Sequence, residues 1–227
     1  MAATLGRMNG WWVSETWAVS PVLTVSWAVW VVMSITLHEL GHGYAATWQG
    51  DRTPRDLGRL TPNPLVHMGG ASLIAFAIFG FAWGMMPVDP RQFRWRGWGE
   101  ALVAFAGPAV NIVLGLVALT IAGVMLARVN DPSPSQINTL TFLLIGGSLN
   151  GMLLVLNMIP VPPLDGATVV AEVVPGMRAI LKNPQVQTYG ALAVLVLFAT
   201  GLFGWLWGPV EELCGGYAGW VARITAG

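Results

Sequence analysis

The sequence predicts an all-α membrane protein with about four transmembrane helices, one re-entrant apolar segment and short extended strands. Hydrophobic residues make up 55% of the 227 residues and charged residues only 10%, whereas soluble domains average about 25% charged residues. Several apolar runs also approach or exceed the roughly 20 residues that a helix needs to cross a bilayer. These two observations exclude an ordinary soluble domain.

Charge and cysteine content exclude further classes. Eleven Lys and Arg balance eleven Asp and Glu, so nothing favours nucleic-acid binding, and no basic run indicates an electrostatic lipid anchor. The single cysteine, Cys214, excludes an internal disulfide and a cysteine-based zinc site. Any bound metal must therefore be held by His, Asp or Glu.

The first span is expected at residues 22–48, and its last third contains His38, Glu39 and His42. On an α-helix the two histidines project from one face, as two ligands of one metal must. This is the H-E-x-x-H pattern of zincins, in which the metal lowers the pKa of a bound water to roughly 7 and the glutamate takes its proton. So short a pattern also occurs by chance in soluble helices. Three ionisable residues in membrane surroundings nevertheless favour a functional site.

A polar segment at residues 51–67 is too rich in proline and glycine for a long helix. The apolar stretch that follows, residues 71–88, is marginal in length for a span. If it crossed the bilayer, Lys and Arg would divide five to six between the two sides, and if it turned back they would divide eight to three. The positive-inside rule favours the second arrangement, so we expect a re-entrant segment. The group of eight is Arg52, Arg55, Arg59, Arg91, Arg94, Arg96, Arg178 and Lys182.

The second and third spans are expected at residues 101–127 and 140–159. The second carries Asn111, and the third carries Asn150 and Asn157, which lie seven residues apart and hence on one face. A buried amide needs a hydrogen-bond partner, so that face should look into the bundle. For Asn111, packing between helices and a substrate-binding role are equally good explanations.

Three prolines end the third span and predict an extended segment at residues 160–164, beginning with Pro160. At membrane depth such a segment must line a cavity. Asp165 follows it, and Gly166 allows a sharp turn or a close backbone approach. Asp-Gly after prolines also suits a surface turn. Because catalytic zinc usually takes three protein ligands and one water, Asp165 is the leading candidate for the third ligand, ahead of His67, which we expect in an exposed loop.

The fourth span is expected at residues 189–207, and the region after it carries no readable chemistry. With no internal repeat and no soluble second domain in view, residues 1–227 should form one membrane domain with a core at about 22–175. The N-terminal region, in which Arg7 is the only basic residue before Trp11, is expected to be retained rather than removed as a signal peptide. Trp11, Trp12 and Trp17 predict an interfacial belt.

Three motifs in this order resemble the site-2 protease family of intramembrane zinc metalloproteases: HELGH at residues 38–42, AGPAVN at 106–111 and NMIPVPPLDG at 157–166. By this resemblance, His38, His42 and Asp165 correspond to the ligands of one zinc ion per chain. Glu39 corresponds to the catalytic base. The supporting or substrate-binding positions would be Asn111, Asn157, Pro160 and Gly166.

The resemblance also implies where such a protein works and on what. It implies a multi-pass protein of the bacterial inner membrane, an active site opened towards the cytoplasm, and substrates that are transmembrane helices of regulatory membrane proteins. Residues 58–67 look like the minimal bacterial branch, which lacks an inserted PDZ domain. That branch usually continues with an acidic residue and a proline after the histidine, whereas Met68-Gly69-Gly70 follows His67 here.

A non-enzymatic membrane protein is the competing interpretation, either an inactive relative that binds membrane helices or a metal carrier. An inactive relative would be expected to lose Glu39 or a ligand first, and all four positions are intact. A carrier would be expected to show several metal sites along its spans, and the sequence offers one cluster.

Overall fold

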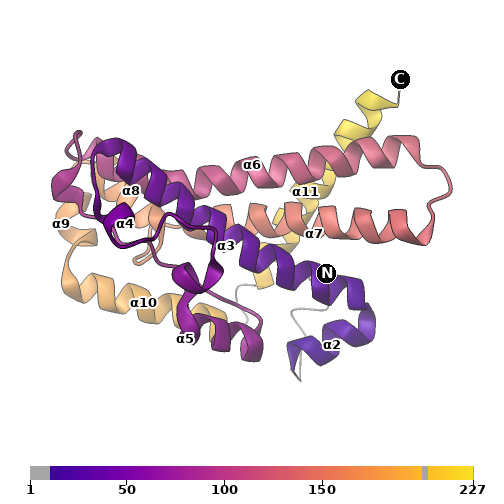
Figure 1. Cartoon of the computed structure of the whole chain (residues 1–227), viewed down its shortest axis with the longest axis horizontal. Coiled ribbons are helices and arrows are strands. Elements are labelled where there is room, and N and C mark those ends of the chain that lie inside the picture. Colours follow the sequence, from indigo (N-terminus) through magenta and orange to yellow (C-terminus); the bar gives the residue numbers. More distant parts are fainter. Residues whose placement is uncertain (1–10, 201–203, 227) are drawn as a thin grey trace.

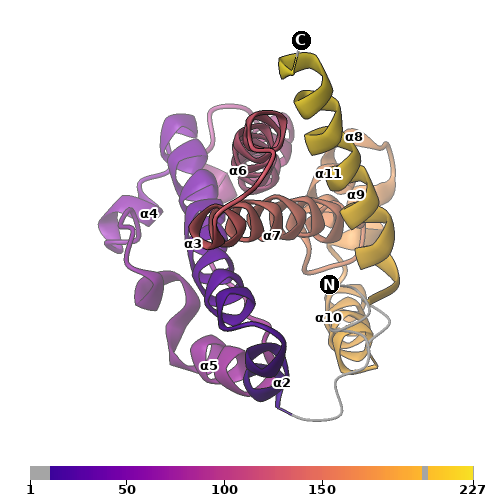
Figure 2. The same cartoon turned by 90° about the vertical axis from the view of Figure 1, so that its right-hand side faces the viewer.

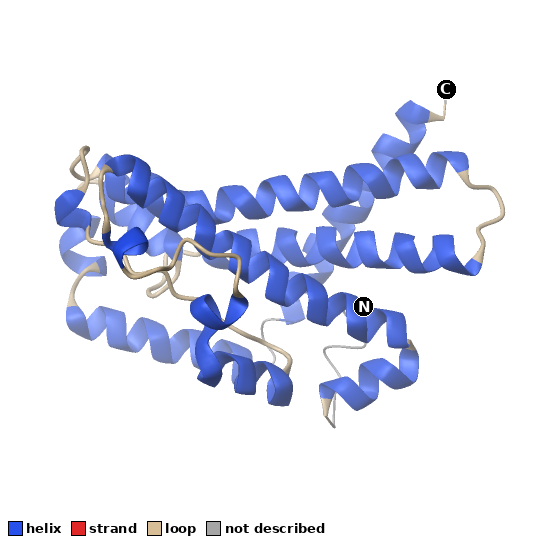
Figure 3. Ribbon diagram, viewed as in Figure 1, coloured by secondary structure: helices blue, strands red, loops and turns tan. Residues whose placement is uncertain are grey.

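The structure is a computed structural model that describes residues 11–200 and 204–226. Within these residues all regular structure is helical and no strand occurs, which confirms the all-α class (Figure 3). The helices are α2 (Trp12–Val19), α3 (Pro21–Gln49), α4 (Thr53–Asp56), α5 (Pro64–Phe79), α6 (Trp98–Arg128), α7 (Pro134–Asn157), α8 (Asp165–Val173), α9 (Met177–Leu181), α10 (Pro184–Ala199) and α11 (Gly204–Thr225), with a 3-10 turn, η1 (Pro90–Gln92).

Among the described residues, α3, α6 and α7 are long and apolar enough to cross a membrane. They confirm the three spans expected from residues 22, 101 and 140 onward. Seen end-on, α7 lies in the middle, in contact with α3, α6 and α11 (Figure 2). The core between these helices is built from large apolar side chains, among them Trp30, Ile35, Ile145, Met152 and Trp207.

Local signals set the ends of these helices. Pro21 occupies the start of α3, where its fixed φ suits a helix, and Gly50 ends it with a φ of 104°. Ser133 and Gln136 form a capping box at the start of α7. With a rise of 1.5 Å per residue, His38 lies about 16 Å from the C-terminal end of α3, which is roughly half the thickness of a bilayer core.

Residues 51–97 leave α3 at its C-terminal end and return to the same end. The carboxylate of Asp51 marks the meeting point, because it accepts the backbone N–H of Thr53 (2.8 Å) and that of Asp89 (2.7 Å). Nearby, the backbone N–H of Arg94 donates to the carbonyl of Gln49 (2.8 Å). Segments 52–59 and 91–96, which carry the two groups of arginines, therefore lie at one end of the bundle (Figure 1), as a re-entrant segment requires.

Within residues 51–97, the point farthest from the C-terminal end of α3 is the C-terminus of α5. There, tryptophan side chains donate hydrogen bonds to the last backbone carbonyl groups of the helix. The indole N–H groups of Trp11, Trp12 and Trp27 donate to the carbonyls of Ala77 (2.8 Å), Phe76 (3.0 Å) and Gly80 (3.1 Å), respectively. A helix end in apolar surroundings needs such partners because no water is there to supply them. Of the three tryptophans of the predicted interfacial belt, Trp12 is buried within the protein, whereas Trp11 and Trp17 are exposed; the belt itself stays a prediction.

Two other expectations need correction. Residues 160–164 form consecutive turns, not an extended strand, because the N–H of Val161 bonds to the carbonyl of Ile159 (2.8 Å) and that of Leu164 to Val161 (3.0 Å). The span expected at residues 189–207 is not confirmed as one helix, since it is divided between α10 and α11, and residues 201–203 lie outside the described residues. The C-terminal region is a helix, α11, that packs against α6 and α7.

Candidate active site

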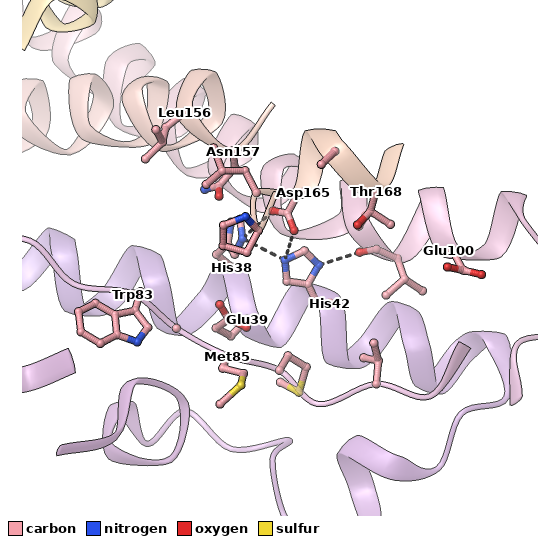
Figure 4. A pocket seen from close by; sticks show the side chains of 18 of the residues that line it. His38, Glu39, His42, Trp83, Met85, Glu100, Leu156, Asn157, Asp165 and Thr168 are labelled. Atoms are coloured by element: carbon pink, nitrogen blue, oxygen red, sulfur yellow. Dashed lines mark hydrogen bonds and ion pairs between the residues drawn. The ribbon is translucent and has the colours of Figure 1, made fainter. Parts of the chain in front are cut away.

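The fold brings His38, His42 and Asp165 together from two separate helices. The two histidines lie one turn apart on α3, and Asp165 is the first residue of α8. His38 Nε2 is 3.1 Å from Asp165 Oδ2, His42 Nε2 is 3.4 Å from Asp165 Oδ1, and the two Nε2 atoms are 3.0 Å apart (Figure 4). Both imidazoles are buried. The three residues therefore form one compact cluster inside the protein.

The other ring nitrogen of each histidine faces an oxygen atom on α6. His42 Nδ1 lies 2.7 Å from the carbonyl oxygen of Val103, and His38 Nδ1 lies 2.6 Å from Asn111 Oδ1. Because an oxygen of this kind only accepts, both Nδ1 atoms must donate. In a neutral imidazole the proton then sits on Nδ1 and the lone pair on Nε2.

Two Nε2 lone pairs and a carboxylate thus converge at about 3 Å, an arrangement that a bound cation would stabilise. Ligand atoms of the three residues all lie within 4.8 Å of one another, which suits Zn²⁺ with three protein ligands and an open fourth position. Gly107 lines the same space, since a Cβ atom there would lie 2.6 Å from His38 Nε2 and still closer to His42 Nε2. The absence of a side chain at residue 107 leaves room for the ion, so the residues present fit zinc.

Glu39 lies beside this cluster and is buried. Its side chain lies between the histidines and the non-helical segment 81–89, where Trp83 and Met85 are drawn (Figure 4). Gly84 of that segment lies directly against it, because a Cβ atom at residue 84 would come within 2.7 Å of the carboxyl carbon of Glu39. Segment 81–89 therefore restricts the position of the Glu39 side chain.

A cavity of about 640 Å³ opens at the cluster. It is lined mostly by apolar side chains of α3, α6, α7, α8 and segment 81–89, together with Asn157 and Thr168. Two of its lining residues, Glu100 and Lys182, belong to an ion-pair cluster of two carboxylates and two cations that joins α6, α8 and α9. Arg178 and Lys182 each contact both Glu100 and Glu172.

The structure places the other predicted site residues as follows. Asn111 is bonded to His38, and Gly166 allows the close approach expected of it, since a Cβ atom there would lie 2.8 Å from the carbonyl oxygen of Ile159. Asn157 lines the cavity but donates to Leu153 of its own helix (3.0 Å). Pro160 is exposed and does not line the cavity.

His67 lies outside the ligand cluster, and its expected position was wrong. It is 2% exposed in the first turn of α5, not in an exposed loop, and its Nε2 lies 2.6 Å from the carbonyl oxygen of Thr61. Because that oxygen only accepts, Nε2 is committed as a donor. Sequence reasoning did not find the parts played by Gly84, Gly107 and the carbonyl of Val103, which carry no chemical signature of their own.

Fold and site together define a membrane protein with a candidate metal site of the zincin type between helices long enough to span a bilayer. The profile of peptidase family M50 matches residues 123–201. YwhC of Bacillus subtilis, whose name describes it as a putative zinc metalloprotease, is 35% identical over 183 residues, covering 79% of this chain and 83% of the relative. The zinc metalloprotease MJ0392 of Methanocaldococcus jannaschii is 25% identical over 79% of this chain and 44% of its own length.

A third relative, Rip2 of Mycobacterium tuberculosis (strain H37Rv), carries the same description as YwhC and is 27% identical over 92% of this chain and 81% of its own length. No solved structure matches the chain. The chain belongs to peptidase family M50, the site-2 protease family. The resemblance drawn from the three sequence motifs is thereby confirmed.

Proposed function

We propose that this protein is an intramembrane zinc metalloprotease that hydrolyses peptide bonds within or near transmembrane segments of membrane proteins. The observation that carries the proposal is the convergence of two imidazole lone pairs and a carboxylate beside Glu39, in a cavity between membrane-spanning helices. The names of the relatives as zinc metalloproteases support the same activity.

His38, His42 and Asp165 would hold one zinc ion per chain. Zinc in such a site supplies a Lewis acid that polarises the scissile carbonyl and makes a bound water acidic. The negative charge of Asp165 offsets part of the dication's charge, which lowers the cost of holding it in dry surroundings. The bonds of Nδ1 to Val103 and Asn111 keep both rings turned towards the ion.

Glu39 is the general base in this proposal. It stands next to His38 in the sequence but off the face that carries both ligands, so it serves the water and leaves the metal's coordination to the other three residues. Its carboxylate takes the proton of the attacking water and later passes it to the leaving amine.

The substrate is expected to bind as an unwound chain. A helical substrate buries its carbonyls in its own hydrogen bonds, so it must open locally before attack. Segment 81–89, which lacks regular structure, passes beside Glu39 and offers backbone for strand addition. Pro163, Leu164 and Asn157 line the cavity wall around Asp165 and complete the proposed binding cleft.

We further infer that the end of the bundle with the two arginine groups faces the cytoplasm of a bacterial inner membrane. Arg178 and Lys182 bind Glu100 near the start of α6, so all eight cations of the larger group lie at this end. The positive-inside rule then sets the orientation. The cavity extends towards the same end, because Glu100 and Lys182 line it, and this supports an active site that faces the cytoplasm.

The non-enzymatic alternatives are not favoured. In the part of the chain that the structure describes, one group of His, Cys, Asp and Glu could hold a metal, whereas a carrier needs a path of several. The test is incubation of the purified protein in detergent with a model transmembrane substrate, with and without a chelator. Cleavage that stops with the chelator and resumes with added zinc is expected, and chelator-insensitive cleavage would refute a metalloprotease mechanism.

A further inference from the structure

A polar chain runs from the centre of the helix bundle to one of the proposed metal ligands. Asn150 on α7 donates to the carbonyl of Gly146 (2.9 Å) and to Ser34 Oγ on α3 (3.0 Å). Its Oδ1 accepts from Asn111 Nδ2 on α6 (2.9 Å), and Asn111 Oδ1 faces His38 Nδ1 (2.6 Å). The three membrane-spanning helices thus meet in one line of hydrogen bonds that ends at His38.

The hydrogen bonds between Asn150, Asn111 and His38 can run in only one donor-to-acceptor direction. The carbonyl of Gly146 can only accept, so the Asn150 atom facing it must be the amide nitrogen. The oxygen of Asn150 then faces Asn111, which must present its own nitrogen there and its oxygen to His38. His38 Nδ1 is left with no choice but to donate, so its Nε2 carries the lone pair that faces Asp165.

Burial keeps the two amide groups in this orientation. Ser34, Asn111 and Asn150 are all 0% exposed, so water cannot replace a lost partner and an amide turned the wrong way would set like groups against each other. The other histidine has a different kind of hydrogen-bond partner, because His42 Nδ1 faces the backbone carbonyl of Val103 and not a side chain. That carbonyl cannot rotate independently, whereas the amide of Asn111 could turn over if Asn150 did not hold it.

We propose that Asn150, which touches neither the metal ligands nor Glu39, is a positioning residue that sets the tautomer of His38 through Asn111. Without the oxygen of Asn150, the amide of Asn111 is free to turn its N–H towards His38 Nδ1. The imidazole then accepts at Nδ1 and carries its proton on Nε2, where the metal should bind. This inference rests on the proposed zinc site but adds a determinant in the middle of α7.

The experiment measures the zinc Kd of purified protein in detergent by competition with a chromophoric chelator, with the thermal stability of the metal-free protein measured in parallel. We expect Asn150→Leu and Asn111→Leu each to weaken zinc binding by about 10- to 100-fold, the usual effect of removing a hydrogen-bond partner of a ligand. Asn111→Asp presents an acceptor to Nδ1 whichever way the carboxylate is turned, so it should keep zinc binding. Its second oxygen then faces Asn150 Oδ1 in place of the amide N–H, so the stability of the metal-free protein should fall.

The double variant Asn150→Leu with Asn111→Asp separates positioning from packing. A carboxylate has no N–H to turn towards His38, so the double variant should regain the affinity of Asn111→Asp alone even if its metal-free stability stays low. A general loosening of the bundle would not be rescued in this way. Thr120→Val is the matched control, because it removes another polar contact of α6, to the Tyr217 hydroxyl (3.1 Å), and should leave the zinc Kd unchanged.

The outcomes separate the two proposals. A wild type without stoichiometric zinc would overturn the proposed function and this inference with it. A wild type that binds zinc, together with an Asn150→Leu variant of unchanged Kd, would overturn the inference and leave the zinc site standing. Weakened binding in Asn150→Leu that Asn111→Asp fails to restore would show a packing effect and would likewise overturn it.

Discussion

Adding a single methyl group at Gly107 should prevent zinc binding. In Gly107→Ala, the new Cβ would lie 2.6 Å from His38 Nε2 and closer still to His42 Nε2. Zinc binds imidazole nitrogen at about 2.0–2.1 Å, so methyl group and ion would compete for the same space. The imidazoles cannot easily retreat, because their Nδ1 atoms are bonded to Asn111 and Val103.

The fold itself should survive this substitution. Replacing a helix-interior glycine by alanine favours the helix by about 1 kcal/mol, and inserting a methyl group into a packed site costs about 1–3 kcal/mol. From these typical values the net loss of stability is about 0–2 kcal/mol. Zinc affinity should fall by more than about 100-fold, beyond the usual loss when only a ligand's hydrogen-bond partner is removed.

Metal analysis of the purified variant, beside a cleavage assay and a thermal denaturation of the metal-free protein, tests this reasoning. Gly216→Ala on α11 is the matched control, since it changes the helix by the same methyl group and meets nothing within 4 Å. It should keep full zinc content and activity. A Gly107→Ala protein that retained one zinc per chain and normal cleavage would refute the argument that the space beside Gly107 holds the ion.

Three further predictions concern the residues that the sequence already indicated. Glu39→Gln should retain zinc and lose about 10²- to 10⁴-fold in rate, because the carboxylate serves the water and not the metal; metal content and cleavage are measured on the same sample. Asp165→Ala should lose zinc and cleavage, whereas His67→Ala should keep zinc and at least part of the activity, as metal analysis of both variants will show. Cysteines introduced in place of Arg55 and Arg94, in a variant without the native cysteine, should react with an impermeant thiol reagent from the same side of the membrane.

Each of these predictions has a clear contrary result. Wild-type turnover by Glu39→Gln would remove the proposed general base. A zinc-free His67→Ala beside a zinc-replete Asp165→Ala would exchange the roles of the two residues. Labelling of positions 55 and 94 from opposite sides would mean that residues 71–88 cross the bilayer.

The sequence predicted those parts of the structure that depend on local pattern. Apolar runs of sufficient length located α3, α6 and α7, and the four-residue spacing of His38 and His42 put both on one helix face. Asp165 was indicated by the chemistry of the incomplete ligand set, and the structure brings it to the histidines. The spans and the histidine pair could each be read from one short stretch, whereas Asp165 needed the chemistry of two stretches to be combined.

What the sequence did not predict depends on contacts between distant segments. Trp12 resembles an interfacial residue until α5 is seen to end beside its indole, 64 residues further along the chain. Asn150 was expected to face the interior, but its link to His38 passes through Asn111 on another helix. Residues 160–164, with their prolines, look extended by local rules, yet backbone hydrogen bonds of Val161 and Leu164 fold them into turns.

The close contact of α3 with α6 explains why the metal site and the packing of the bundle cannot be separated. Gly41 lies between the two histidines, and a Cβ atom there would lie 2.8 Å from the carbonyl oxygen of Ala106. Gly107 follows on α6 at the same level, so the absence of side chains at these two glycines lets the helices approach. Only at this separation can α6 reach both Nδ1 atoms with hydrogen bonds below 3 Å. A larger residue at Gly41 should therefore weaken zinc binding even though it touches no ligand, because it would move both acceptors away together.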